Sequence, residues 1–405
     1  MHILLIHQAF AGLDEAGGTR HYEMAAHLVQ RGHRVTIIAS PVSYLSGQSR
    51  HTRPRWVERS YPQPGITILR TYTYTALHKS FVHRVFSFLS FMFSSFLNGL
   101  SVGEVDLVWG TSPPIFQGVT AWLLARIKRV PFLFEVRDLW PDFAIAVGVL
   151  RSPLLIRASF WLEGFLYRHA DRLMVNSPGF IQHVTSRGAR QVELIPNGAD
   201  PDMFDPNLDG GDFRRAHSLE GKFIVLYAGA HGLSNDLEIV LQAAKQLMDD
   251  PGVQFLFIGD GKEKSALLQR AQQLELSNTL FLPPIPKAEM NGALAASDAC
   301  IAILKPLDWY KTTYPNKVFD YMAAGRPVLL AIDGVIRQVV EEAAAGLFVP
   351  PGNAAELAAA VRRLAADPGL AQRMGQAGRA AILAKFNRKL LSDQFAYLVE
   401  DMENK

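Results

Sequence analysis

The sequence predicts an α/β protein made of two doubly wound domains with parallel sheets. Short apolar runs rich in Val, Ile, Leu and Phe alternate with amphipathic segments of helix length along most of the chain. Continuous apolar runs are typical of parallel strands that are covered on both faces. The series of runs begins again near residue 222, after the stretch richest in Pro, Gly, Asn and Asp. These observations indicate one domain on each side of a hinge.

The predicted elements follow this pattern in order. The first series of strands is Ile3–Ile6, Val35–Ile38, Ile66–Leu69, Leu107–Trp109, Phe132–Glu135, Arg172–Val175 and Val192–Ile195. The second series is Ile224–Ala228, Gln254–Ile258, Leu280–Leu282, Ala299–Ile303, Val328–Ala331 and Leu347–Val349. Clear helical patterns between them are Arg20–Arg31, Leu237–Asp249 and Ala354–Ala366. We therefore expect domains at 1–205 and 206–385, with a helix at 386–405 that packs back on the first domain.

Composition excludes several classes of protein. The chain has 405 residues, of which 49% are hydrophobic and 20% charged, so it has the composition of a folded protein. Its single cysteine, Cys300, excludes a disulfide scaffold and a cysteine-based metal site. The first residues have no cationic leader, and the uncharged stretch 85–100 is shorter than the roughly 20 residues that cross a bilayer. We expect a cytoplasmic protein.

The net charge of +3 conceals an uneven distribution. Residues 1–200 hold 20 basic and 13 acidic residues, whereas residues 201–405 hold 21 and 25. Between Arg59 and Gly103 there is no acidic residue, but Arg59, Arg70, Lys79 and Arg84 are present. Six phenylalanines lie between residues 81 and 96. A basic flank beside an aromatic helix fits a segment that lies on anionic lipid, and a helix buried in the first domain is the alternative.

A loop with two neighbouring glycines follows the first strand of the first domain. Gly17 and Gly18 lie in the loop that precedes the helix beginning near Arg20. A flexible loop at a helix N-terminus can offer backbone N–H groups to an anion, and an ordinary loop with a helix cap is the alternative. No G-x-G-x-x-G motif follows the strand, so the dinucleotide fingerprint is absent.

The densest polar cluster of the first half runs from Glu135 to Asp142, directly after an apolar strand. Carboxylates at such a position are costly unless they are paired or face a polar ligand. We expect Glu135 or Asp138 to orient a hydroxyl group or to meet developing positive charge. The alternative is a structural pair between Arg137 and Asp138.

Two glycine turns end strands of the second domain. Tyr227-Ala228-Gly229-Ala230-His231-Gly232 ends one strand, and Ile258-Gly259-Asp260-Gly261-Lys262 ends the next. Glycine lets the backbone approach a ligand closely, and a lysine beside it can meet phosphate. For Lys262, a plain surface lysine is the alternative.

The most informative segment is 314–328, in which Pro315 suits a helix start and Gly325 suits its end. Lys317 lies in the first turn, where the helix dipole disfavours a cation, so an anion bound there would explain its presence. Asp320 lies one turn further on and is suited to sugar or ribose hydroxyls. An ordinary Lys317–Asp320 pair on a solvated helix is the alternative.

These motifs resemble the family 4 glycosyltransferases. The resemblance rests on P-x-K-x-F-D-Y-M-A-x-G-x-P-V at 315–328, I-P-N-G-A-D at 195–200, G-D-G-K at 259–262 and E-E-x3-G-L-x2-P-x-G at 341–352. It covers essentially the whole chain in the right order. It implies the GT-B fold, with two Rossmann-like domains facing a central cleft. It also implies retaining transfer of a sugar from a UDP-sugar, with no metal and no other cofactor.

The resemblance assigns roles residue by residue. Asp320 matches the second acid of the family's Glu-x7-Glu pair, which binds ribose hydroxyls, and Lys317 matches a position near the diphosphate. Thr312 stands in place of the first acid, which puts the usual donor-sugar contact in doubt. Pro284 and Ile285 match the stretch that meets the nucleobase. The turn after Gly229 lacks the usual Arg and Lys, so His231, Gly232, Gly261 and Lys262 would compensate, and Gly17-Gly18 matches the N-terminal glycine loop.

In the first domain, Gly18-Thr19-Arg20-His21-Tyr22-Glu23-Met24 and Glu135-Val136-Arg137-Asp138-Leu139-Trp140-Pro141 resemble a bacterial subgroup. Those enzymes build surface polysaccharides such as O-antigen and capsule, and often transfer amino or deoxy sugars such as N-acetyl-L-fucosamine. The subgroup implies a polyprenyl-diphosphate-linked saccharide acceptor at the inner face of the membrane. We assign Arg20, Arg137 and Asp138 to acceptor binding, and Asp138, Glu135 and Lys317 to catalysis.

Other functions fit the predicted architecture. A UDP-N-acetylhexosamine 2-epimerase shares two such domains but needs no separate acceptor. A non-enzymatic sugar-binding protein is a third reading. Nucleic-acid binding is disfavoured because the basic residues are interleaved with an apolar run, and no G-x-S-x-G motif supports a hydrolase.

Overall fold

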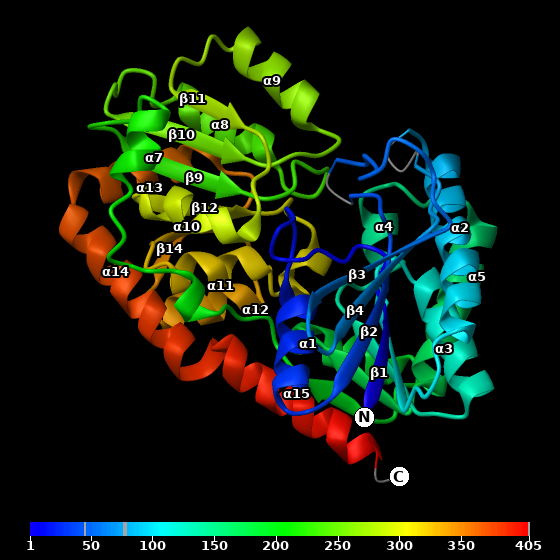
Figure 1. Cartoon of the computed structure of the whole chain (residues 1–405). Coiled ribbons are helices and arrows are strands. Elements are labelled where there is room, and N and C mark those ends of the chain that lie inside the picture. Colours follow the sequence, from blue (N-terminus) through cyan, green and yellow to red (C-terminus); the bar gives the residue numbers. More distant parts are fainter. Residues whose placement is uncertain (44–45, 76–78, 404–405) are drawn as a thin grey trace. The chain divides into compact units, whose positions relative to one another are not determined.

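A computed structural model shows the chain folded into two units, each with its own sheet (Figure 1). It describes residues 1–43, 46–75 and 79–403. The first unit contains Met1–Gly12, Gly18–Pro196 and Lys389–Lys405, and the second contains Leu13–Gly17 and Asn197–Arg388. The chain therefore passes between the units inside the predicted hinge, ahead of the expected boundary at residue 205.

The sheet of the first unit has eight strands among the described residues, in the order β3-β4-β2-β1-β5-β6-β7-β8. The strands are β1 (His2–Ile6), β2 (Arg34–Ala39), β3 (Val57–Gln63), β4 (Ile66–Thr71), β5 (Leu107–Ser112), β6 (Phe132–Val136), β7 (Arg172–Val175) and β8 (Val192–Leu194). All neighbours pair in parallel except β3 and β4, which are antiparallel. Parallel pairing places the carboxyl ends of the strands at one edge of the sheet.

Helices cover both faces of this sheet. They are α1 (Arg20–Gln30), α2 (Phe81–Leu100), α3 (Phe116–Lys128), α4 (Asp142–Ala146), α5 (Pro153–His169), α6 (Ile181–Ser186) and α15 (Arg388–Glu403). Helices α1 and α15 pack on one face with Ile3 and Leu5. Helices α2, α3 and α5 pack on the other face with Leu4 and Ile6. The alternation of Ile3, Leu4, Leu5 and Ile6 between two cores explains why the strand is apolar throughout.

The second unit has a parallel sheet in the order β11-β10-β9-β12-β13-β14. Its strands are β9 (Phe223–Ala228), β10 (Val253–Ile258), β11 (Thr279–Leu282), β12 (Ala299–Ile303), β13 (Val328–Ala331) and β14 (Gly346–Phe348). Its helices are α7 (Gly211–Ala216), α8 (Leu237–Lys245), α9 (Lys264–Gln273), α10 (Met290–Ala295), α11 (Asn316–Ala323), α12 (Val335–Glu342), α13 (Ala354–Ala366) and α14 (Pro368–Ala381). Helices α10, α11 and α12 cover one face. Helices α8, α9 and α13 cover the other.

Short helical turns connect several of these elements. They are η1 (Pro178–Phe180), η2 (Pro201–Met203), η3 (Lys287–Glu289), η4 (Asp308–Thr312) and the π-helical η5 (Ile382–Phe386). Two of them carry residues of the candidate site described below. No helix in the described part of the chain is both long and apolar enough to cross a membrane.

Every strand predicted from an apolar run coincides with an observed strand. One observed strand, β3, was not predicted. This edge strand is largely exposed and carries Glu58, Arg59 and Pro62, so it has no apolar run to reveal it. It forms by pairing with β4 alone, which is the position where a polar strand with a proline is tolerated.

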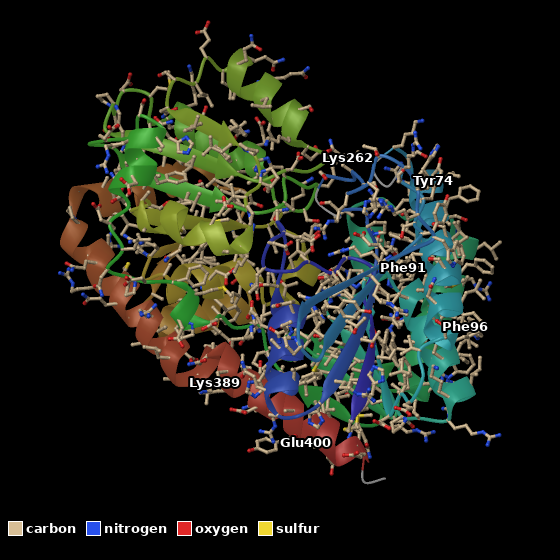
Figure 2. The ribbon with its side chains drawn as sticks, in the orientation of Figure 1. Tyr74, Phe91, Phe96, Lys262, Lys389 and Glu400 are labelled. Carbon is tan, nitrogen blue, oxygen red and sulfur yellow. The ribbon has the colours of Figure 1, made fainter. Side chains whose placement is uncertain are left out.

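Helix α15 returns to the first unit and completes its core. Phe395 is fully buried and its ring centroid lies 4.5 Å from that of Trp109 on β5. At the rim, Arg31 donates two hydrogen bonds of 2.9 Å to Glu400, which is labelled in Figure 2. The C-terminal helix is therefore an integral layer of the first unit.

We predict that Phe395→Ala lowers the unfolding free energy of the first unit by about 3–5 kcal/mol, the usual cost of a large core cavity. Hydrogen exchange of the β1 and β5 amides measures this loss. Leu390→Ala is the matched control, because Leu390 lies on the same helix and is 47% exposed. Equal effects of the two substitutions would contradict the packing of α15 described above.

Candidate functional site

Two glycine turns interlock at the carboxyl edge of the second sheet. Gly229, Gly259 and Gly261 have φ angles of 142°, 149° and 153°, which L side chains rarely adopt. A Cβ atom on Gly259 would lie 1.9 Å from the Gly229 carbonyl oxygen, and one on Gly261 would lie 2.5 Å from that of His231. The His231 N–H donates to the Asp260 carbonyl at 2.8 Å. The turns after β9 and β10 therefore need glycine to pack against each other.

Lys317 of α11 brings a cation to these turns. Its ammonium nitrogen is buried and has no hydrogen-bond acceptor among the described residues. The nitrogen lies 3.9 Å from the centroid of the Tyr227 ring, and a Cβ atom on Gly229 would lie 2.9 Å from it. Burial lowers the pKa of Lys317 to about 7. A buried ammonium group without an acceptor is costly, so this position is suited to an anionic ligand.

Tyr321 fixes the helix that carries Lys317. It lies one turn further along α11 and is 1% exposed. Its hydroxyl accepts a hydrogen bond from the Ala228 N–H at 3.0 Å and donates to the Ala228 carbonyl at 3.2 Å. Because residues four apart share a helix face, this clamp at the end of β9 holds Lys317 over Gly229.

The other residues predicted in these turns differ in how far they are exposed to solvent. His231 is fully buried, and neither ring nitrogen has a partner among the described residues. Burial, with the charges of Lys264 and Lys317, lowers the pKa of His231 to about 4, so its imidazole is neutral near pH 7. Gly232 is partly buried beside it, whereas Lys262 is exposed (Figure 2).

Asp320 lies on α11 beyond Lys317 but pairs with a different lysine. The Lys287 ammonium, at the start of η3, is 2.5 Å from Asp320 Oδ2, and both side chains are largely buried. Asn316 Nδ2 also donates to Asp320 Oδ2, at 3.2 Å. The alternative of a Lys317–Asp320 pair on a solvated helix is therefore wrong. Lys287 is not among the residues predicted for the site, although its place just after β11 and a proline-rich turn was a usable signal.

The remaining predicted donor residues lie in the turn after β11 and at the end of η4. Pro284 and Ile285 are partly buried in the turn after β11, and Ile285 packs against the core of the unit. The Thr312 hydroxyl donates to the Trp309 carbonyl at 2.6 Å, which helps close η4. A cavity of about 140 Å³ lies nearby, lined by Lys305, Pro306, Leu307, Asp308, Tyr310, Lys311, Ile332, Asp333 and Pro351. None of the predicted donor residues lines it, so the buried charges locate the site better than this cavity does.

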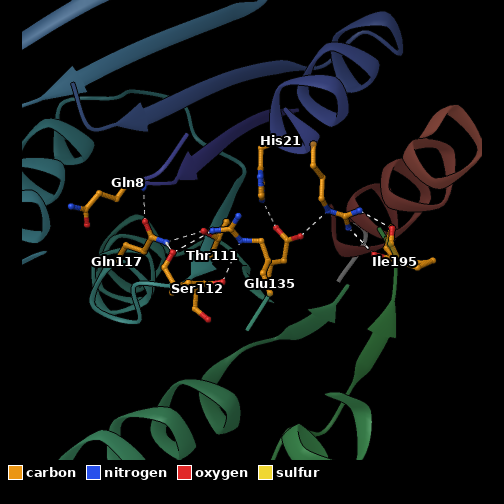
Figure 3. A network of polar contacts seen from close by, with 11 residues as sticks. Gln8, His21, Thr111, Ser112, Gln117, Glu135 and Ile195 are labelled. Atoms are coloured by element: carbon orange, nitrogen blue, oxygen red, sulfur yellow. Dashed lines mark hydrogen bonds and ion pairs between the residues drawn. The ribbon is translucent and has the colours of Figure 1, made fainter. Parts of the chain in front are cut away.

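In the first unit, Glu135 of β6 is the centre of a buried polar network (Figure 3). Its carboxylate accepts from His21 Nε2 at 2.6 Å and from Arg20 Nε at 3.2 Å. Arg20 also donates to the carbonyl oxygens of Ile195 and Pro196, at 2.7 and 2.8 Å. Burial alone would raise the pKa of Glu135, but His21, Arg20 and Arg137 outweigh it and hold that pKa below its usual range. Glu135 is thus a buried anion that fixes two residues of α1.

Two histidines of this network escaped the list of expected site residues. His7 follows β1 directly and is 1% exposed, with no partner for either ring nitrogen among the described residues. Its ring centroid lies 4.1 Å from that of His21. Burial lowers the pKa of both rings, so both are neutral near pH 7. A histidine at the carboxyl end of the first apolar strand was the signal that could have singled out His7.

Arg137 and Asp138 lie in the turn after β6, with Asp138 half-buried. Arg137 donates to the carbonyl oxygens of Ser112 and Pro113, both at 3.3 Å. Burial raises the pKa of Asp138 to about 6, against the opposing charge of Arg137. In the loop before α1, Gly17 has a φ of 151°, and a Cβ atom on Gly18 would meet nothing within 4 Å. Arg137, Asp138 and Gly18 thus supply polar groups and open backbone in the first unit, whereas Gly17 is the last residue of a short segment assigned to the second unit.

One cluster in the described residues has the spacing of metal ligands. Asp142, Glu163 and His183 each place a ligand atom within 4.8 Å of the others. Arg187 and His183 lie against its carboxylates: Glu163 is 2.9 Å from Arg187 and 2.7 Å from His183, and Arg187 is 3.6 Å from Asp142. The cluster joins α4, α5 and α6, and its charge balance favours a structural role over metal binding.

We predict that Lys317→Met raises the free energy of unfolding of the protein without ligand, because it removes a buried cation that lacks an acceptor. The unfolded chain keeps this lysine protonated at pH values above about 7, where the folded chain releases the proton. Wild-type stability should therefore rise with pH above 7. The advantage of the variant should be largest below pH 7 and should shrink as pH rises.

Urea unfolding at several pH values measures this difference. Lys262→Met is the control, because Lys262 is exposed in the neighbouring turn and its loss should change stability little. A destabilised Lys317→Met variant at pH 6 would contradict the description of the buried ammonium.

Comparison with known proteins agrees with this arrangement. Residues 16–198 match the model of the glycosyl transferase 4-like domain, and residues 211–381 match that of the glycosyl transferases group 1. The chain is 26% identical over 277 residues to a probable glycosyltransferase, WbjE, of Pseudomonas aeruginosa, covering 67% of this chain and 68% of that protein. It is 24% identical over 313 residues to WcaI of Escherichia coli, a putative colanic acid biosynthesis glycosyl transferase, covering 75% and 76%.

Solved structures share the fold over the whole length. Sucrose-phosphate synthase of Thermosynechococcus elongatus superposes with a TM-score of 0.78 at 22% identity, covering 99% of this chain and 98% of that one. HepE of Anabaena, solved with UDP-glucose, gives a TM-score of 0.72 at 16% identity, covering 99% and 100%. Both halves of the chain thus match domains of one class of enzyme. The protein is a glycosyltransferase with the GT-B fold, built from a glycosyl transferase 4-like domain and a glycosyl transferases group 1 domain.

Proposed function

We propose that this enzyme transfers a sugar, with retention of configuration, from a UDP-sugar to a lipid-linked saccharide. The observation that carries the donor assignment is the buried Lys317 ammonium, which has no acceptor among the described residues and lies against Gly229 in the turn after β9. A diphosphate supplies the missing negative charge, and the lack of a side chain on Gly229 leaves room for the Lys317 ammonium beside it. The UDP-glucose complex of HepE supports a nucleotide-sugar donor, and the family matches do not support the epimerase alternative.

In the proposed reaction, the bond between the anomeric carbon and the diphosphate breaks as negative charge grows on the leaving phosphate. Lys317 stabilises that charge through its ammonium group. The acceptor oxygen bonds to the same face of the sugar, and its proton passes to the leaving phosphate. No metal or further cofactor enters this scheme.

Within the first unit, we assign Arg137 and Asp138 to the acceptor. Asp138 is half-buried with a raised pKa of about 6, so it can accept a hydrogen bond from an acceptor hydroxyl near neutral pH. The Arg20 side chain is committed to Glu135 and to the backbone of Ile195 and Pro196, and Glu135 also accepts from His21. In this proposal Arg20 therefore serves the acceptor indirectly, by fixing α1. In this proposal Glu135 is a positioning residue, rather than the catalytic residue expected from the sequence.

The finer assignment concerns the sugar and the product. We propose an N-acetylated amino or deoxy sugar, of the L-fucosamine type, and a role in O-antigen or capsule synthesis. Support comes from the subgroup motifs around Arg20 and Asp138 and from the name of WcaI, which refers to colanic acid biosynthesis. Transfer of radiolabelled sugar from a panel of UDP-sugars to polyprenyl diphosphate saccharides tests it. Release of a free epimer without transfer would contradict it.

For the donor site, we predict that Lys317→Met weakens UDP binding by about ten- to a hundredfold, the range of a charge-assisted hydrogen bond. Bound diphosphate keeps Lys317 protonated, whereas the free enzyme releases this proton above pH 7. Wild-type affinity should therefore fall as pH rises from 7 to 9, by at most about tenfold per pH unit.

Calorimetric titration with UDP at each pH measures both effects. Lys317→Arg is the matched variant, because arginine stays charged over this range and its affinity should change less with pH. An unaltered affinity in Lys317→Met would remove Lys317 from the donor site.

Helix α2 supports a peripheral association with the membrane. Phe91 is fully buried, but Phe86 and Phe93 are 59% and 60% exposed, so the helix packs by one face and exposes another (Figure 2). The exposed residues recur every three or four positions: Val82, Phe86, Leu89, Phe93, Leu97 and Leu100. Lys79 is exposed just before the helix, whereas Arg84 is two residues from both Val82 and Phe86 and so lies on the face opposite this stripe. Arg70, which the sequence placed in the basic flank, is instead buried and donates to the Ser40 carbonyl, and the side chain of Phe81 lies outside the described residues.

We predict that the wild-type enzyme sediments with phosphatidylglycerol vesicles at low salt and that salt weakens this binding. Replacing Phe86 and Phe93 together by Ser should lower vesicle affinity by about tenfold or more, since each loses a large apolar contact. Tyr61→Ser on β3 is the control, because Tyr61 is 67% exposed on another element of the same unit. Absence of wild-type sedimentation, or equal loss in the control, would exclude this surface.

A further inference from the structure

Lys287 and Asp320 form a buried pair of opposite charge in the second unit. Their side chains are 9% and 15% exposed, and Lys287 Nζ lies 2.5 Å from Asp320 Oδ2. They come from different elements, η3 and α11. A pair held at this distance and depth keeps a fixed geometry, because breaking it would leave a buried charge without a partner.

The surroundings fix the direction of each member. Asn316 Nδ2 holds the same Asp320 oxygen at 3.2 Å, and Arg388 Nη2 holds Asn316 Oδ1 at 3.2 Å. The Lys287 ammonium lies 5.1 Å from the centroid of the Phe204 ring, which is 1% exposed. Lysine has three N–H donors, and these described contacts engage one with Asp320 and direct another toward the aromatic face. A donor therefore remains on Lys287 beside the carboxylate.

We propose that Lys287 determines nucleoside specificity at the donor site, where it reads the ribose diol together with Asp320. This inference rests on the proposed UDP-sugar function. A vicinal diol has two neighbouring oxygens, each of which can donate and accept a hydrogen bond. The ammonium nitrogen and the carboxylate oxygen are a donor and an acceptor at a similar separation. One hydroxyl donates to Asp320 while its neighbour accepts from Lys287.

The position of Lys287 in the chain agrees with this role. It follows the turn Pro283–Pro286 after β11, which contains the residues expected at the nucleobase. Asp320 lies three residues after Lys317, the cation expected at the diphosphate. The pair thus lies on the two segments that would hold the base and the diphosphate, and the ribose joins these two groups.

The test is calorimetric titration of UDP, 2′-deoxy-UDP and 3′-deoxy-UDP into the full-length wild-type enzyme and its variants. The wild type should bind UDP at least about tenfold more tightly than either deoxy analogue, as expected for a site built to hydrogen-bond a hydroxyl. Lys287→Met should bind UDP about tenfold more weakly and should lose its preference over at least one analogue. Lys287→Arg retains a cationic donor and should retain part of that preference.

A second variant covers the case in which Lys287→Met does not fold because Asp320 has lost its cation. The double variant Lys287→Met/Asp320→Asn removes both charges together, and it should bind all three nucleotides with similar, weak affinity. Lys385→Met is the matched control, because Lys385 is an exposed lysine of the same unit and should bind like the wild type.

The possible results separate the two claims. If wild-type enzyme binds no uridine nucleotide, the proposed function fails. If UDP binds but Lys287→Met, or the double variant, keeps wild-type affinity and discrimination, the role of Lys287 is wrong and the proposed function stands. The inference is supported if the preference for UDP over the deoxy analogues is lost in Lys287→Met and the double variant but kept in Lys385→Met.

Discussion

Parallel pairing of the strands within each sheet is the constraint on which the rest of the structure depends. It requires a helical crossover between neighbouring strands, which buries both faces of the sheet and makes the strands apolar throughout. It also gathers the carboxyl ends of the strands at one edge. In the second unit this brings the turns after β9 and β10 next to α11, although Gly229 and Lys317 are far apart in sequence. In the first unit it brings His7, Arg20 and Glu135 together.

The buried charges at this edge of the sheet have different partners in the two units. In the first unit, Glu135 has two partners and its pKa stays below the usual range. In the second unit, Lys317 has no acceptor among the described residues and its pKa falls to about 7. A satisfied network stabilises its local structure, whereas an unsatisfied buried charge costs stability. The buried charge therefore lowers the stability of the second unit, and an anionic ligand bound beside it would restore that stability. Such destabilised positions are common at functional sites.

The sequence was sufficient to predict the strands and the two-unit organisation, because parallel strands buried on both faces are continuous apolar runs. It failed at β3, whose only partner is β4 and whose side chains are mostly exposed. It correctly predicted a short helix after Pro315 that carries Lys317 and Asp320, and their role at the donor site stays a prediction. It could not predict that Asp320 pairs with Lys287, because that contact depends on how η3 and α11 pack. It also could not show that Arg20 and Glu135 bind each other, since they lie on different elements that only the sheet brings together.

The central claim is that Lys317 is a buried ammonium group held ready for a diphosphate. An NMR titration of the enzyme with isotope-labelled lysine, with the Lys317 resonance assigned through Lys317→Arg, tests this claim most directly. We expect a midpoint near pH 7 in the free enzyme and a midpoint at clearly higher pH with UDP bound, because the diphosphate favours the charged form. A midpoint near the ordinary lysine value of 10.5 in the free enzyme, unchanged by UDP, would contradict the account.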